Sequence, residues 1–137
     1  MSLFVDTSVF YASVDADDFD HERARSILAR DERLVTSDHI LVETWRLLRV
    51  RTGRDVAEQF WTTIRAGTAA VEFVEPQDLE LAWAIGQQFP DQDFSIVDRT
   101  SFALMQRIGV HRVTSFDSDY AIYRFGPRRD RAFEIVA

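Results

Sequence analysis

The stretch Leu3-Phe4-Val5-Asp6 is a short apolar run that ends in an acidic residue. A run of this length predicts a buried strand, and the carboxylate marks the point where the strand leaves the core. Residues 34–36, 71–74 and 113–114 have the same strand character, and residues 133–136 form a candidate edge strand.

Helical patterns lie between these strands. Asp38 and Ser95 are candidate N-caps, and Gly53 and Gly109 are stop signals. The helices expected are residues 9–14, a segment around 24–28, 39–52, 55–66, 76–89 and 95–108. The alternation predicts an α/β fold, with a central parallel sheet of four to five strands flanked by helices on both faces. We expect residues 1–137 to form a single domain, with its ligand site at the carboxyl ends of the strands.

Composition removes several classes of protein. All 16 basic residues are arginine, and the chain contains no lysine and no cysteine. Without lysine, phosphate-loop NTPases, Schiff-base enzymes, receiver domains and haloacid-dehalogenase-like phosphatases are excluded. Without cysteine, thiol catalysis, disulfides and zinc-cysteine sites are excluded. The net charge of −7 disfavours a general nucleic-acid coat protein but leaves open an enzyme that acts on nucleic acid locally.

The chain shows neither a long apolar span nor a signal-peptide pattern. We therefore expect a cytoplasmic protein with no membrane segment.

Four carboxylates interrupt apolar surroundings, namely Asp6, Glu43, Asp98 and Asp117. Two of them follow strands, and two fall in the first or second turn of helices that begin near the same edge of the sheet. Converging carboxylates raise each other's pKa unless a cation lies among them. Oxygen ligands suit Mg²⁺ or Mn²⁺, so the pattern predicts a divalent metal site.

Each acid also has an ordinary structural interpretation. Asp6 and Asp117 are candidate caps or turn residues, and Glu43 suits a solvated helix face. Asp98 completes the capping box Ser95-x-x-Asp98.

Two further acids belong to the same region. Asp119 competes with Asp117 for the fourth position of the site, and Asp93 lies near the same edge as a supporting or capping residue.

These residues resemble the motifs of the PIN-domain family, and of VapC-type toxins of bacterial toxin–antitoxin modules in particular. The similar segments are, in order, Phe4-Val5-Asp6-Thr7-Ser8-Val9, Leu41-Val42-Glu43-Thr44, Asp93-Phe94-Ser95-Ile96-Val97-Asp98 and Val113-Thr114-Ser115-Phe116-Asp117-Ser118-Asp119-Tyr120. Each motif is short, but the ordered set spans nearly the whole chain. One departure is Arg99 directly after Asp98, where small residues are commoner.

The resemblance implies a metal-dependent endoribonuclease, most simply the toxin of a toxin–antitoxin module. It implies that Asp6, Asp98 and Asp117 hold Mg²⁺ (or Mn²⁺) and that Glu43 binds the metal or orients the attacking water. It also implies that Thr7 and Ser115 support the acids and that the products carry 5′-phosphate and 3′-hydroxyl ends. The chemistry agrees, because one or two such ions can activate water, shield the phosphate and stabilise the leaving oxygen. The alternatives are a housekeeping PIN nuclease of RNA processing and a nuclease-inactive PIN fold that acts as a binding module.

The expected partners are the RNA substrate, a small antitoxin protein and a second copy of the chain in a homodimer. Candidate RNA contacts are Arg46, Arg49, Arg99 and Arg128, because guanidinium groups bind phosphate bidentately. Ordinary surface roles remain the alternative, since arginine must supply every surface cation of a chain without lysine. The three tryptophans, Trp45, Trp61 and Trp83, are expected in the core, and the resemblance offers an exposed position at the antitoxin interface as the alternative for one of them.

Overall fold

The computed structural model describes residues 1–137. Strands and helices alternate along most of the chain, as the sequence predicts. The elements are β1 (Ser2–Val5), α1 (Thr7–Val14), α2 (His21–Leu28), β2 (Arg33–Ser37), α3 (Asp38–Arg51), α4 (Arg54–Arg65), β3 (Ala70–Glu72), α5 (Pro76–Gln88), α6 (Ile96–Ile108), β4 (Arg112–Thr114), α7 (Asp119–Ile122) and β5 (Glu134–Ile135).

The five strands form one sheet in the order β3-β2-β1-β4-β5, and every neighbouring pair is parallel. Strand β1 lies at the centre, where Phe4 pairs with Val35 of β2 on one side and with Val113 of β4 on the other. The chain builds one half of the sheet outward from β1 and then returns to build the other half. The switch point therefore falls between β1 and β4, where α/β sheets commonly bind their ligands.

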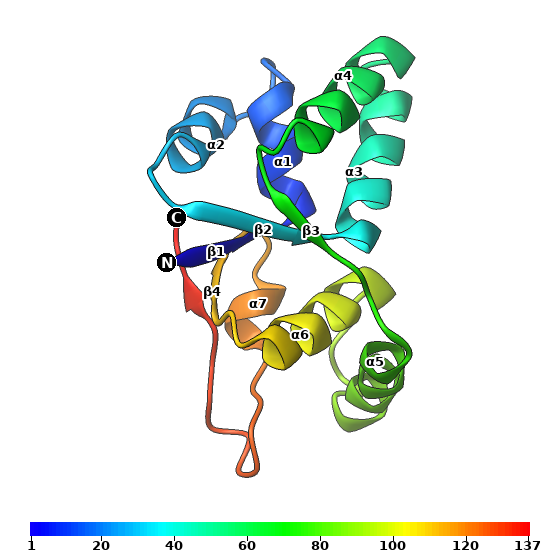
Figure 1. Ribbon diagram of the computed structural model, residues 1–137. Coiled ribbons are helices and arrows are strands. Elements are labelled where there is room, and N and C mark those ends of the chain that lie inside the picture. Colours follow the sequence, from blue (N-terminus) through cyan, green and yellow to red (C-terminus); the bar gives the residue numbers. More distant parts are fainter.

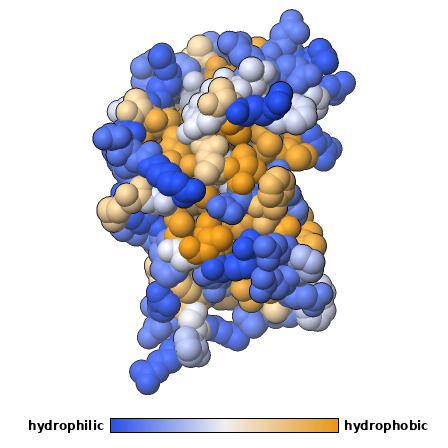
Figure 2. All heavy atoms as spheres, in the orientation of Figure 1, coloured by the Kyte–Doolittle hydropathy of each residue, from blue (hydrophilic) through white to orange (hydrophobic).

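Helices cover both faces of the sheet, which confirms the predicted architecture. Figure 1 shows α1, α2, α3 and α4 on one side of the strands and α5, α6 and α7 on the other. In the same orientation, apolar side chains gather across the middle of the molecule at the level of the sheet, with hydrophilic side chains above and below (Figure 2). The buried core lies between the sheet and the helix layers, and it includes Leu3, Phe4 and Val5 of the central strand.

An aromatic cluster fills the core on the side of α6 and α7. The Phe102 ring stacks on Tyr123 with centroids 4.4 Å apart, and it meets Tyr120 edge to face at 5.1 Å. Phe125 and Phe133 extend this cluster toward β5, with centroids 4.8 Å apart. The cluster fixes the position of α7, which is too short to be stable alone.

Two sequence expectations about local structure are wrong, and one short helix was not expected. The N-cap of α3 is Ser37, whose Oγ accepts a hydrogen bond of 3.1 Å from Ile40 N, rather than Asp38. Asp38 Oδ1 instead accepts a 2.9 Å hydrogen bond from Val74 N and ties α3 to the segment after β3. The third strand ends at Glu72 rather than at Val74, and the four-residue α7 was not predicted.

The tryptophans occupy three different environments. Trp45 packs against the core, as expected, while Trp61 and Trp83 are 45% and 66% exposed. The core assignment of these two side chains is therefore wrong. None of the helices combines the length and apolar character that crossing a membrane requires.

Candidate metal centre

Asp6 lies at the carboxyl end of β1 and at the N-cap position of α1. Its carboxylate makes no capping hydrogen bond, although the residue occupies the capping position. Oδ2 instead accepts hydrogen bonds from Ser115 Oγ at 2.8 Å and from Ser8 Oγ at 3.1 Å, and Oδ1 accepts one from the Tyr120 hydroxyl at 3.2 Å. The side chain is buried, and burial raises the pKa of its carboxyl group.

Glu43 approaches the same region from α3. The hydroxyl of Thr7 donates a hydrogen bond of 2.6 Å to its Oε1, which joins the start of α1 to α3. Partial burial raises the pKa of Glu43, and the negative charges of Asp6 and Asp117 add to the shift. Glu43 therefore lies close enough to Asp6 and Asp117 to interact electrostatically with both.

Asp98 stands in the first turn of α6. The predicted capping box is present, because Asp98 N donates to Ser95 Oγ at 3.0 Å and Ser95 N donates to Asp98 Oδ2 at 3.3 Å. The same carboxyl group faces other acids. Burial, a hydrogen bond with Asp119 and the charges of Asp6 and Asp117 raise its pKa to about 8. Asp98 is therefore both a capping residue of α6 and a member of the acidic cluster.

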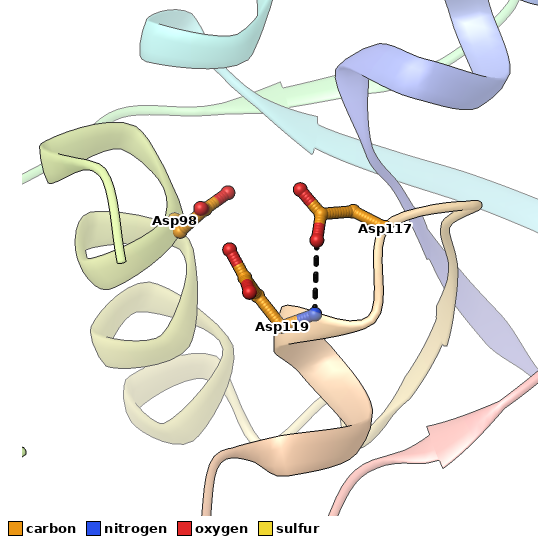
Figure 3. Close-up of side chains that lie close together, drawn as sticks. All are labelled: Asp98, Asp117 and Asp119. Carbon is orange, nitrogen blue, oxygen red and sulfur yellow. Dashed lines mark hydrogen bonds between the residues drawn. The ribbon is translucent and has the colours of Figure 1, made fainter. Parts of the chain in front are cut away.

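Asp117 and Asp119 follow β4 and complete the cluster (Figure 3). Asp117 N donates to Ser115 Oγ at 3.0 Å, and Asp119 N donates to Asp117 Oδ1 at 3.0 Å. Carboxylate oxygens of Asp98, Asp117 and Asp119 lie within 4.8 Å of one another. Asp119 therefore stands beside Asp117 in the cluster rather than replacing it.

The sequence did not single out two side chains that hold Asp6 in place. Ser8 belongs to the motif after β1, and its spacing of two residues from Asp6 is the only local signal of its contact. Tyr120 is fully buried, and burial raises the pKa of its hydroxyl well above the usual range. An aromatic residue in an apolar-rich chain is normally part of the core, so only the folded structure reveals that the Tyr120 hydroxyl donates to Asp6.

The acids of this cluster have no cationic partner. Asp78, the remaining buried acid of the chain, receives Arg107 in an ion pair of 3.0 Å. No arginine or histidine forms an ion pair with the five acids of the site, which are Asp6, Glu43, Asp98, Asp117 and Asp119. Uncompensated carboxylates in a partly buried cluster are costly unless a cation binds among them. The ligands on offer are all oxygen, so the residues fit Mg²⁺ or Mn²⁺ rather than a softer metal.

The other predicted residues lie apart from this cluster or at its margin. Asp93 is exposed in the loop before α6 and does not join the acids. Arg99 turns its guanidinium between α5 and α6, where Nη1 donates to Ala82 O at 3.1 Å and packs against Gly86. This placement gives Arg99 a packing role and does not present it to a phosphate.

The remaining arginines are on the surface. Arg46 lines a recess of about 610 Å³ together with Thr7 and Glu43, directly beside the acids. Arg49 is exposed in the last turn of α3, and Arg128 is exposed in the segment between α7 and β5. Of the four candidate RNA contacts, Arg46 is the one that shares a recess with a residue of the cluster.

Comparison with known proteins agrees with this arrangement. The family model described as the PIN domain matches residues 3–126. A protein named 23S rRNA-specific endonuclease VapC20, from two strains of Mycobacterium tuberculosis, is 37% identical over 125 residues. The match covers 90% of this chain and 95% of the relative.

Solved structures show the same fold. The crystal structure of M. tuberculosis VapC20, described as a sarcin-ricin loop cleaving toxin, superposes with a TM-score of 0.82 at 33% identity, over 87% of this chain and 92% of that one. VapBC2 from Rickettsia felis, bound to a promoter DNA fragment, matches with a TM-score of 0.70 at 6% identity, over 99% and 98% of the two chains. A toxin–antitoxin complex from Klebsiella pneumoniae matches with a TM-score of 0.62 at 12% identity, over 98% and 96%. From the family match and the VapC20 identity together, the chain belongs to the PIN domain family.

Proposed function

We propose that this protein is a metal-dependent endoribonuclease that hydrolyses phosphodiester bonds in RNA. The observation that carries the proposal is a set of acids without any cationic partner. Carboxylate oxygens of Asp98, Asp117 and Asp119 lie within 4.8 Å of one another, and Asp6 after β1 and Glu43 in the second turn of α3 lie beside them. The similarity to a 23S rRNA-specific endonuclease supports RNA as the substrate. We propose that it acts in the cytoplasm and that residues 1–137 form a single nuclease domain.

The proposed metal ligands are Asp6, Asp98, Asp117 and Asp119, with Glu43 as a further ligand or as the residue that orients the attacking water. When bound, Mg²⁺ or Mn²⁺ would supply an activated water, shield the phosphate charge and stabilise the leaving oxygen. Thr7 fixes the carboxylate of Glu43 through its 2.6 Å hydrogen bond. Burial and the charges of Asp6 and Asp117 raise the pKa of Glu43, which makes its carboxylate a better proton acceptor.

The recess beside Glu43 supports RNA binding next to the acids. Arg46 lies on its wall, and the apolar side chains of Val42 and Leu47 line it as well. In the proposed complex Arg46 contacts an RNA phosphate beside the acids, Arg49 contacts the RNA backbone one helical turn farther along α3, and apolar side chains contact a base. Guanidinium groups suit this role because they bind phosphate bidentately.

We also propose that the protein is the toxin of a toxin–antitoxin pair. An apolar recess of about 230 Å³ lies on α3 and α4, and its lining residues are Leu41, Val42, Trp45 and Trp61. Exposed tryptophan and valine at one place on the surface are typical of a protein interface. The antitoxin would bury an apolar segment there.

Association with a second copy is a separate part of the proposal. Leu79 and Trp83 are exposed one turn apart on α5, away from the apolar recess of α3 and α4. We propose that this pair contributes to a homodimer, because large apolar side chains on one helix face favour self-association.

The decisive experiment combines purified protein with growth measurements. Cleavage of total RNA should require Mg²⁺ or Mn²⁺, stop in excess EDTA, and leave 5′-phosphate ends. Expression of the wild-type chain alone should arrest growth, and expression of Asp98→Asn should not. Cleavage that persists in EDTA or in Asp6→Asn would overturn the metal mechanism, whereas metal-dependent cleavage without growth arrest would favour a housekeeping RNA-processing nuclease.

A further inference from the structure

The segment between α7 and β5 concentrates positive charge in an acidic protein. Residues 124–131, here named the basic hairpin, contain four arginines and one aspartate, a net charge of +3, whereas the rest of the chain carries −10. Such a contrast is the electrostatic footprint of a surface that meets a polyanion.

The basic hairpin has a defined shape. Phe125 and Arg131 form an antiparallel bridge, with Phe125 N donating to Arg131 O at 2.9 Å and Arg131 N donating to Phe125 O at 3.1 Å. Phe125 is buried in the aromatic cluster beside Phe133, which anchors the base of the hairpin to the core. The tip is therefore held by the fold, and little ordering entropy would be lost on binding.

The turn at the tip adopts a left-handed backbone conformation. Arg129 is the sole non-glycine residue with a positive φ, at 50°, and its N donates to Gly126 O at 3.0 Å. Gly126 has φ 89°, and a Cβ there would lie 3.0 Å from Arg131 Cδ, so glycine lets the Arg131 side chain cross the turn. An unfavourable backbone conformation that the surrounding structure holds in place often marks a functional surface.

The four arginines divide into two structural and two free ones. Arg124 Nη1 donates to three backbone carbonyls at the end of α7, and the Arg131 guanidinium lies 5.0 Å from the centroid of the Phe125 ring. Arg128 and Arg129 are exposed and make no side-chain hydrogen bond, ion pair or aromatic contact. A recess of about 460 Å³ adjoins Arg129 and includes the amide side chains of Gln88 and Gln106.

The hairpin lies at the opposite end of the sheet from the acids. It leads into the amino end of β5, which is parallel to β4, whereas Asp6 and Asp117 follow the carboxyl ends of β1 and β4. Figure 1 shows the turn projecting from the molecule beyond β5. A four-residue strand spans about 13 Å, so a ligand that touches both ends extends over more than one nucleotide.

We propose that the basic hairpin is a second RNA-binding site, in which Arg128 and Arg129 contact backbone phosphates of an RNA whose scissile bond lies at the acids. The inference rests on the proposed ribonuclease function and adds that the bound RNA extends from the acids to the opposite end of the sheet. Such contacts carry no sequence information, and they position the RNA on the protein.

The test measures binding of a fluorescent RNA stem–loop in EDTA, so that no cleavage occurs, at several NaCl concentrations. Arg128→Ala/Arg129→Ala should weaken binding about tenfold and make the slope of log affinity against log salt less steep by about 1.5, because each lost phosphate contact removes roughly 0.7–0.9. Arg128→Lys/Arg129→Lys should keep the wild-type slope. The charge-matched control, Arg25→Ala/Arg30→Ala, removes two exposed arginines of the α2 region and should change affinity less than twofold.

Wild-type affinity and slope in the alanine variant, with its thermal unfolding unchanged, would overturn the proposal. So would equal losses in both alanine variants, or hairpin-dependent binding to anionic vesicles or to polyglutamate with no effect on RNA. Cleavage by wild type and by Asp98→Asn is measured separately on the same RNA. Failure of the ribonuclease function would appear there, and failure of the hairpin site would appear only in the binding data.

Discussion

The hydroxyl of Tyr120 donates a hydrogen bond of 3.2 Å to Oδ1 of Asp6, although the two residues are 114 positions apart. The ring of Tyr120 packs against Phe102 in the aromatic cluster, and its hydroxyl reaches the acidic cluster. The packing of the core and the orientation of Asp6 are therefore coupled through one side chain.

Replacement Tyr120→Phe should keep the aromatic packing and remove the donor to Asp6. We expect the unfolding free energy to fall by about 1 kcal/mol, as for the loss of one hydrogen bond. The Mg²⁺ concentration for half-maximal cleavage should rise several-fold, because Asp6 loses a group that orients it and stabilises its ionised form. Thermal unfolding and metal titration of the activity measure the two effects.

Tyr123→Phe provides the matched control. Its hydroxyl accepts a hydrogen bond of 2.9 Å from Gln106 Nε2 and contacts no acid of the cluster. This variant should lose similar stability and keep the wild-type metal requirement. Equal metal requirements in both variants would show that Tyr120 serves packing alone.

Stability without metal should depend on pH in a direction set by Asp98. Its pKa is about 8 in the folded state and about 4 in the unfolded chain, so the folded state binds more protons between these values. Stability should therefore fall as pH rises from about 4 to 8, by an amount on the order of 5 kcal/mol at most. Thermal melts in EDTA at pH 5.5 and 8 measure the effect.

Asp98→Asn should flatten that pH dependence, because an amide does not titrate. Added Mg²⁺ should stabilise the wild-type protein more at pH 8 than at pH 5.5, since protons compete with the metal for the carboxylates. A wild-type melting temperature in EDTA that changes no more between pH 5.5 and 8 than that of Asp98→Asn would contradict the assignment.

Asp93 and Asp119 should behave differently, although the sequence marks both as supporting acids. Asp119→Asn removes a carboxylate from within 4.8 Å of Asp98 and Asp117, and we expect at least a tenfold loss of kcat at saturating RNA. Asp93→Asn changes an exposed acid outside the cluster and should keep wild-type activity. Comparable losses in the two variants would argue that the loop before α6 closes onto the acids during catalysis.

Arg99 and Arg46 are expected to have different roles, since Arg99 packs between helices and Arg46 is proposed to contact RNA. Arg99→Ala should lower the unfolding free energy by about 1–3 kcal/mol, because a guanidinium packed between α5 and α6 is removed. Its RNA affinity should be unchanged. Arg46→Ala should show the reverse, with wild-type stability and an RNA affinity reduced several-fold. Melting temperature and binding titration of both variants decide between the two roles.

Much of the fold could be predicted because its signals are local. The apolar run before Asp6, the capping box at Ser95 and the glycine after α6 each mark an element boundary within a few residues. The parallel sheet follows from the alternation of elements. The prediction of the α3 cap is wrong because Ser37 and Asp38 are both good capping residues. Their roles differ only in the folded structure, where Asp38 accepts a hydrogen bond from Val74 N and Ser37 caps the helix.

The candidate site was only partly accessible to sequence reasoning. The acids stand out because carboxylates are rare in apolar surroundings, whereas Tyr120 and Ser8 belong to the site through contacts made after folding. Trp61 and Trp83 were assigned to the core because large apolar side chains are usually buried. Their exposure is a property of the assembled helices and leaves no mark on local periodicity.

The central position of β1 has a consequence for synthesis of the protein. Phe4 of β1 pairs with Val113 of β4, so the two halves of the sheet can join only after β4 has been synthesised. A ribosome that has translated only as far as α6 has produced three of the acids but neither Asp117 nor Asp119. The growing polypeptide therefore cannot assemble the cluster early, and the full set of carboxylates comes together only after β4 and α7 have joined the fold.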